Sequence, residues 1–302
     1  MDPMTDLPRH RTRRTTVRAG AALLVVLALV ASGCAKKNPD TRPGDIDSYV
    51  ALGDSYTAVA GDSPVTHAAC LRSNDDYPNL LAERLSIADF KNVACAGATS
   101  AALETTQYPA NKRGSNPPQL DAVNEDTKLV TLGIGLNDTG LSFYLLYTCL
   151  PYQGKITAAC TKYLSKPDGF IDGAVRTIGS EVAGDLTKIR KKAPDARIVL
   201  IGYPRMMPDT GGCPEQMPLP DEALDRIRKA LKDVNDAMER AARRTRVDYV
   251  DMYTASKGHD VCSDSPWVNG QANIPGKALA FHPYDEYHAA VADKLAFLLE
   301  KK

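Results

Sequence analysis

Short apolar runs alternate with longer helical patterns along this chain from residue 49 onward, and this alternation limits the fold more than any other feature. The runs have the length of buried strands, and they are Tyr49–Leu52, Asn92–Cys95, Leu129–Ile134, Arg197–Ile201 and Val247–Val250. The helical patterns space apolar residues three or four apart, and they are Tyr77–Leu85, Phe170–Lys191, Glu222–Arg244 and Tyr284–Lys302. We therefore predict an α/β fold, a three-layer α/β/α sandwich with a central parallel sheet.

Length and charge narrow the class of protein further. The chain has 302 residues, of which 43% are hydrophobic, so one domain with a sizeable core accounts for most of it. Residues after position 33 include 32 basic and 35 acidic side chains, which gives this part a net charge of −3. Nucleic-acid binding needs clustered Lys and Arg, so the acidic net charge argues against it. We also expect the protein to be a monomer.

The N-terminus has the pattern of an export signal. A basic stretch, Arg9–Arg18, precedes an apolar stretch, Ala21–Ala31, that is too short to span a bilayer as a helix. Ala31-Ser32-Gly33-Cys34 follows and resembles a bacterial lipobox, which implies cleavage before Cys34 and lipid attachment to it. We expect a signal peptide at 1–33, a flexible tether at 34–47 and the folded domain at 48–302.

Such a lipid would hold the protein to the membrane without spanning it. The expected location is therefore the outer face of the cell envelope. The alternative is a plain secretory signal with an incidental cysteine, which would give a secreted protein.

Six cysteines remain when Cys34 is set aside, an even number that suits disulfides in an exported protein. Sequence alone allows fifteen pairings. We favour nearest-neighbour order, in which each bridge holds one loop: Cys70–Cys95, Cys149–Cys160 and Cys213–Cys262. No cysteines have CxxC spacing and no Cys/His group has zinc spacing, so neither a metal nor another cofactor is expected.

Four short motifs stand at the ends of predicted strands or at the start of a helix. Gly53-Asp54-Ser55-Tyr56 follows the first strand, Ala94-Cys95-Ala96-Gly97 ends the second, Gly135-Leu136-Asn137-Asp138 follows the third, and Phe281-His282-Pro283 precedes the last helix. Carboxyl ends of parallel strands meet at one edge of a sheet, where α/β folds bind ligands. Each motif alone is a common turn or cap, and only the four together indicate a site.

The residue types match the needs of acyl transfer by an alcohol nucleophile. A serine hydroxyl, Ser55, needs a base within hydrogen-bonding distance, and His282 is the candidate. The oxyanion of a tetrahedral intermediate needs preorganised donors, which Ser55 N–H, Gly97 N–H and the Asn137 side chain can supply.

With these four motifs the chain resembles the GDSL, or SGNH, hydrolase family, in its extracellular actinobacterial lipase and esterase branch. The four motifs match in order over residues 48–302, and the order of the six cysteines resembles the three disulfides of that branch. The resemblance implies a flavodoxin-like sandwich with Ser55 as nucleophile, His282 as base, and Gly97 and Asn137 in the oxyanion hole.

One departure concerns the group that orients His282. Much of the family has aspartate three residues before the histidine, where Leu279 stands here, so a side-chain triad through that position is impossible. Some members of the branch use a backbone carbonyl instead, and we predict a Ser–His dyad oriented by the Leu279 carbonyl. Asp251, at the end of the last strand, is the rival.

The apolar run 141–147 begins four residues after Asn137 and has two interpretations. It is a buried helix, which is slightly favoured, or it forms a wall for an acyl chain. The leading hypothesis for the whole chain is a serine ester hydrolase, an esterase or lipase, acting on lipid or other acyl esters. The alternatives are an envelope acyltransferase with the same site, and a non-catalytic lipid-binding lipoprotein.

Overall fold

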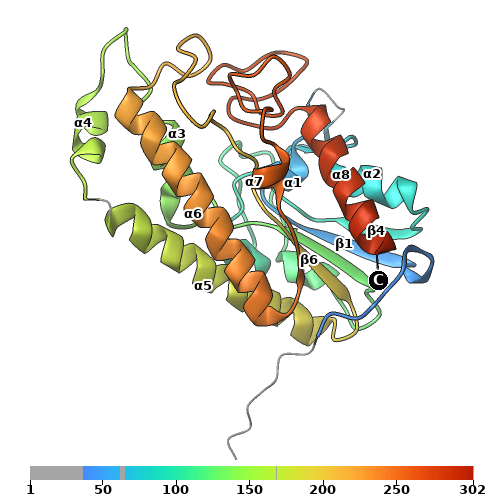
Figure 1. Ribbon diagram of the computed structural model, residues 1–302. Coiled ribbons are helices and arrows are strands. Elements are labelled where there is room, and N and C mark those ends of the chain that lie inside the picture. Colours follow the sequence, from blue (N-terminus) through green and yellow to red (C-terminus); the bar gives the residue numbers. More distant parts are fainter. Residues whose placement is uncertain (1–36, 62–64, 168, 302) are drawn as a thin grey trace, which may run out of the picture. The chain divides into compact units, whose positions relative to one another are not determined.

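A computed structural model describes residues 37–61, 65–167 and 169–301 of the chain (Figure 1). Ala35–Lys302 forms one compact unit. The expected signal peptide and Cys34 lie outside the described residues. Within the described residues, no helix is both long enough and apolar enough to cross a membrane.

Five parallel strands form the central sheet, as the alternating pattern predicts. They are β1 (Ser48–Gly53), β4 (Asp89–Asn92), β5 (Leu129–Gly133), β6 (Arg197–Ile201) and β7 (Asp248–Val250). Their order in the sheet is β4-β1-β5-β6-β7. Counted along the chain this is the order 2-1-3-4-5 of flavodoxin-like folds, which bind ligands where the strand order reverses, between β1 and β5. The predicted fold class is confirmed.

The burial of each strand explains how well the sequence predicted it. Every residue of β1, β5 and β6 is buried, and these strands are apolar except for Ser48, Thr131 and Arg197. The edge strand β4 alternates exposed and half-buried residues, and it begins three residues before the predicted segment 92–95. That segment still runs beside β1, because Val93 N–H and Cys95 N–H donate to the carbonyls of Ala51 and Gly53.

Long helices cover both faces of the sheet (Figure 1). On one side α2 (Tyr77–Arg84) packs against α8 (Asp285–Glu300), and on the other α5 (Gly169–Lys192) packs against α6 (Asp221–Thr245). The crossover through α2 leads from β1 to β4, whereas those through α5 and α6 lead in the opposite direction across the sheet. Right-handed crossovers therefore put these helices on opposite faces.

Short elements occupy the loops between these layers. The helices α1 (Ser55–Ala58), α3 (Leu141–Leu146), α4 (Ala158–Leu164) and α7 (Met252–Ala255) join a small hairpin of β2 (Val65–His67) and β3 (Arg72–Ser73). The disulfides Cys70–Cys95, Cys149–Cys160 and Cys213–Cys262 bridge these loops. The nearest-neighbour pairing is confirmed.

The segment expected to be a flexible tether is instead part of the fold over residues 38–46. The Asn38 side chain donates to Ile198 O at 2.8 Å and accepts from Ile198 N–H at 2.9 Å. Arg197 donates to the carbonyl of Thr41, and Ile46 is 4% exposed. The polar composition of this stretch suggested a tether, but its polar groups bind the amino end of β6.

Candidate active site

The sheet brings the four motifs to one cleft of about 490 Å³ at the carboxyl ends of its strands. Ser55 is the first residue of α1 after β1, Gly97 lies in the turn after β4, Asn137 follows β5, and His282 precedes α8. All four residues line this cleft. Ser55 lies at the point where strand order reverses, between the segments that carry Gly97 and Asn137.

Gly53 is required by the tight connection between β1 and α1. A Cβ at this position would lie 2.6 Å from the carbonyl oxygen of Gly133 and 2.3 Å from the Thr57 hydroxyl. No larger residue fits there without moving the ends of β1 or β5, so the glycine permits the close approach that presents Ser55 to the cleft.

Asp54 caps α1 and connects it to β5 through a tyrosine. One carboxylate oxygen accepts from Tyr56 N–H at 2.9 Å, and the other accepts from the Tyr203 hydroxyl at 2.6 Å. The Tyr203 oxygen in turn accepts from Leu136 N–H, one residue before Asn137. Burial raises the pKa of the Asp54 carboxyl to about 7, and the hydrogen bond from Tyr203 opposes this shift. Asp54 therefore fixes the Ser55 segment relative to the Asn137 segment.

Gln119 makes a second connection to the segment that carries Ser55, and nothing in the sequence indicated it. Its side-chain oxygen accepts from Gly53 N–H at 2.8 Å, and its side-chain nitrogen donates to Gly53 O at 2.9 Å. The residue is completely buried. The amide thus pairs with both backbone groups of Gly53, as a neighbouring strand would, at the point where β4 has ended.

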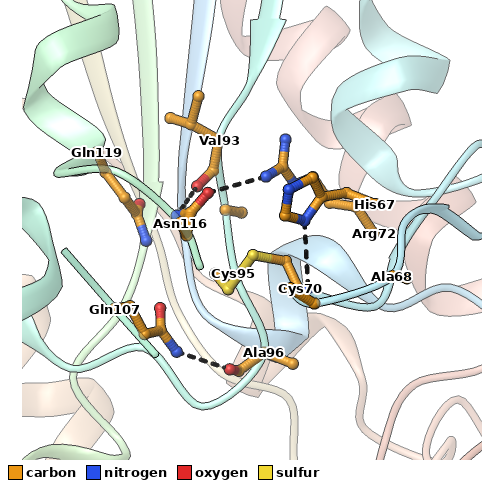
Figure 2. The surroundings of a disulfide bond; sticks show 12 residues. His67, Ala68, Cys70, Arg72, Val93, Cys95, Ala96, Gln107, Asn116 and Gln119 are labelled. Carbon is orange, nitrogen blue, oxygen red and sulfur yellow. Dashed lines mark hydrogen bonds between the residues drawn. A yellow bond between two sulfur atoms is a disulfide. The ribbon is translucent and has the colours of Figure 1, made fainter. Parts of the chain in front are cut away.

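Gly97 lies in a tight turn that begins at Cys95, and Figure 2 shows Cys95 joined by a disulfide to Cys70 of the β2–β3 hairpin. Ala98 N–H donates to Cys95 O, and Gly97 has φ +74°, the pattern of a type II turn whose third residue favours glycine. The Cys70–Cys95 disulfide joins the start of this turn to the hairpin. The Gln107 side chain donates to the carbonyl of Ala96 at 2.9 Å (Figure 2), which leaves Gly97 exposed on the cleft wall.

Asn137 is held so that it can still donate to a ligand. Its side-chain nitrogen donates to Ala98 O at 3.1 Å, and its oxygen accepts from the Ser142 hydroxyl at 3.0 Å. An amide nitrogen carries two protons, so one remains available. The next residue, Asp138, accepts from both the amide and the hydroxyl of Ser100. These bonds join the Gly97 and Asn137 segments to each other.

The carbonyl of Ala280, not that of Leu279, contacts the ring of His282. His282 Nδ1 lies 2.7 Å from Ala280 O, whereas Leu279 O accepts from the backbone N–H of His282 and from the Asn269 side chain. The prediction of a backbone carbonyl is right, but the residue is one position off. Asp251, the rival, caps α7 by accepting from Thr254 N–H.

The contact with Ala280 determines which nitrogen of His282 can act as a base. A carbonyl oxygen only accepts, so Nδ1 carries the proton and Nε2 keeps its lone pair. Burial lowers the pKa of His282, and the hydrogen bond to Ala280 opposes this shift. The imidazole is therefore neutral, and able to accept a proton, at pH values where an exposed histidine is already charged.

The backbone before His282 is fixed by two contacts from separate parts of the chain. Phe281 has φ +60°, which is unusual for a residue other than glycine. The Tyr56 hydroxyl donates to Phe281 O at 2.8 Å, so the residue after Ser55 holds the residue before His282. Asn269 N–H donates to His282 O. These contacts stabilise the strained conformation beside His282.

The structure agrees with both interpretations of the run 141–147, as a buried helix and as a wall of the cleft. Leu141, Leu145 and Leu146 are buried in the core, as expected for a buried helix. Leu146 and the following Tyr147 also line the cleft, together with Leu71 and Phe281. The cleft thus has apolar walls beside its polar groups. In the described residues, no group of three or more His, Cys, Asp or Glu side chains is arranged to hold a metal ion.

Comparisons with known proteins agree with this geometry. The sequence profile of the GDSL-like Lipase/Acylhydrolase family matches residues 51–290, which include all four motifs. The chain belongs to this family. It is 33% identical to Lipase 2 of Streptomyces coelicolor over 264 residues, covering 85% of this chain and 86% of that lipase. Membership makes the chain a lipase or esterase, a hydrolase of carboxylic esters.

Two solved structures resemble this fold. A phospholipase A1 from Streptomyces albidoflavus NA297 has a TM-score of 0.66 and 27% identity, with coverage of 83% of this chain and 98% of that one. An extracellular lipase from Streptomyces rimosus has the same TM-score and identity, with coverage of 82% and 97%. Disulfides here, together with an extracellular relative, are consistent with secretion.

Proposed function

We propose that Ser55 is the nucleophile and His282 the general base of a Ser–His dyad in this ester hydrolase. The observation that supports it most is that both residues line one cleft while Ala280 O holds His282 Nδ1 at 2.7 Å. That contact leaves Nε2 to take the hydroxyl proton as Ser55 attacks the ester carbonyl carbon.

Three donors would then stabilise the oxyanion of the tetrahedral intermediate. Ser55 N–H belongs to the first residue of α1 and has no acceptor within that helix, Gly97 N–H lies in the exposed turn, and Asn137 keeps one side-chain proton. The intermediate collapses when His282 gives its proton to the leaving alcohol. Water that His282 deprotonates then attacks the acyl-enzyme, and the acid leaves.

We assign acyl lipids as the substrate class. The cleft has apolar walls, in which Leu71, Leu146 and Tyr147 lie near the polar groups, so an acyl chain can be buried there. Two similar proteins are a phospholipase A1 and a lipase, which supports the same assignment. We also propose that Cys34 carries a lipid that holds the exported protein to the outer face of the membrane.

Turnover of p-nitrophenyl esters of increasing acyl length tests the dyad and the substrate class together. Ser55→Ala is expected to lower kcat by at least ~10⁴-fold while the circular dichroism spectrum is unchanged. Ser165→Ala removes an exposed hydroxyl at the end of α4 and serves as the matched control. Activity of Ser55→Ala close to that of the control would disprove the nucleophile, and loss of activity with longer acyl chains would disprove the lipid assignment.

A further inference from the structure

Large exposed apolar side chains occur on the wall of the cleft and in chain segments next to it in the sequence. Tyr108, Phe143, Tyr147, Tyr152 and Ile156, which we call the apolar rim, are between 41% and 79% exposed. Tyr108 and Tyr147 line the cleft itself. The other members follow Asn137 on α3 and in the loop that leads to α4, and these two helices lie near each other at one end of the molecule (Figure 1). Exposure of large apolar groups costs solubility, so a cluster beside an active site indicates a binding surface.

The fold holds these side chains outward. Tyr152 and Lys155 exchange two backbone hydrogen bonds, and the Cys149–Cys160 disulfide closes the loop that carries Tyr152 and Ile156. The rim is also connected to the catalytic segment. Phe143 stacks on Tyr147 with ring centroids 6.1 Å apart, and Tyr147 packs edge-on against Phe281 at 4.9 Å, one residue before His282.

The charged residues of the same segments are all basic. Segments 105–118 and 139–167 contain no Asp or Glu, although the chain from residue 34 on is acidic overall. Their basic residues are Lys112, Arg113, Lys155, Lys162 and Lys166, of which all but the partly buried Lys166 are exposed. Exposed aromatic side chains and cations on two segments that carry no anion are complementary to a surface that is apolar inside and negative outside.

We propose that the apolar rim and its four exposed cations dock this protein on an anionic lipid surface. Tyrosine and phenylalanine lie well at the boundary between head groups and acyl chains, and Lys and Arg reach the lipid phosphates. Because Tyr108 and Tyr147 belong to both the rim and the cleft, a docked molecule has its cleft open to the lipid. The proposal rests on the proposed function only for the step after docking, in which an acyl ester enters the cleft.

Vesicle flotation of residues 35–302, which form one compact unit, tests the docking directly. One set of vesicles contains phosphatidylcholine alone, and the other contains about one third phosphatidylglycerol. The charge variant replaces Lys112, Arg113, Lys155 and Lys162 by Gln, and its matched control replaces the exposed Lys91, Lys191, Arg240 and Lys294 by Gln. The aromatic variant is Phe143→Ser with Tyr152→Ser, and Phe297→Ser, which changes an equally exposed residue of α8, is its control.

We expect the protein to bind anionic vesicles at least ~20-fold more tightly than neutral ones. Each basic residue near an anionic surface raises the affinity by about fivefold, so two such contacts are enough. The charge variant loses this preference, while the aromatic variant binds both kinds of vesicle about tenfold more weakly. Both controls behave as the wild type. Equal losses in the control variants, or rim variants that bind vesicles as well as the wild type, would overturn the proposal and point to a protein partner or to net charge alone.

Turnover of soluble p-nitrophenyl acetate tests the proposed catalytic function separately from vesicle binding. Every rim variant is expected to retain this turnover, because none of the altered residues belongs to the dyad or the oxyanion hole. A wild type that binds anionic vesicles but cleaves no ester would leave the docking surface in place and disprove the proposed mechanism. A wild type that cleaves the soluble ester but binds no vesicle would disprove the docking surface and leave the proposed mechanism in place.

Discussion

The paired hydrogen bonds of Gln119 to Gly53 predict that substitutions of Gln119 destabilise the fold. Gln119→Ala removes both bonds, at 2.8 and 2.9 Å. Gly53 O keeps its bond from Cys95 N–H, so the main loss is a buried Gly53 N–H without an acceptor. Such a group costs about 1–3 kcal/mol, and the lost side-chain packing adds ~1 kcal/mol. We expect the free energy of unfolding to fall by ~2–4 kcal/mol.

Gln119→Glu separates hydrogen bonding from packing, because it keeps the shape of the side chain. An ionised glutamate can accept from Gly53 N–H, but its second oxygen then faces the Gly53 carbonyl, which also only accepts. A protonated glutamate restores both bonds. Burial raises the pKa of such a carboxyl in the folded state above its ordinary value of ~4.3, so the variant folds best with its proton bound. Its stability relative to the wild type is therefore greatest below pH ~4.3 and falls as the pH rises toward 7.

Urea unfolding with the disulfides intact, followed by the fluorescence of Trp267, measures these differences at pH 7 and pH 5. We expect Gln119→Glu to be less stable than the wild type at pH 7 and to approach it at pH 5. The exposed Gln216→Glu is the control and changes neither value by more than ~0.5 kcal/mol. For Gln119→Glu we also expect the kcat for p-nitrophenyl butyrate to fall by ~10–100-fold at pH 7, because Gly53 positions Ser55. A stability difference that does not change with pH would refute this account of Gln119.

Three further predictions concern the base and the loop that carries it. Because burial lowers the pKa of His282, the acidic limb of the profile of kcat/KM against pH should have its midpoint below 6.5, and a midpoint above that value contradicts the environment described. Tyr56→Phe removes the bond to Phe281 O and should cost ~1–2 kcal/mol of stability and lower kcat more than it raises KM, as steady-state kinetics can show. Replacing Cys213 and Cys262 together by Ser should lower the unfolding free energy by ~2–5 kcal/mol in urea titrations, because that bridge closes the segment beside the His282 loop.

The sequence predicted which residues meet in the cleft because each lies next to a strong local signal. Ser55, Gly97 and Asn137 follow strand segments, and the carboxyl ends of parallel strands meet at one edge whatever the details of the loops. The edge strand β4 was misplaced by three residues because its half-exposed side chains interrupt the apolar run.

The groups that orient the catalytic residues could not be predicted in the same way. Whether Leu279 or Ala280 supplies the carbonyl for His282 depends on backbone angles in a loop, including the positive φ of Phe281, and no pattern in the sequence encodes them. Gln119 lies 66 residues from Gly53, and no local periodicity connects the two. Residues 38–46 look like a tether for the same reason, since Asn38 binds Ile198, 160 residues away.

The contact between Asn38 and β6 also determines where a force on the N-terminal segment reaches the folded domain. Asn38 binds the amino end of β6, and its own N–H donates to the carbonyl of Arg246 just before β7. The cleft opens at the other ends of the same parallel strands. A pull on the chain before residue 38 is therefore transmitted to the pole opposite the active site.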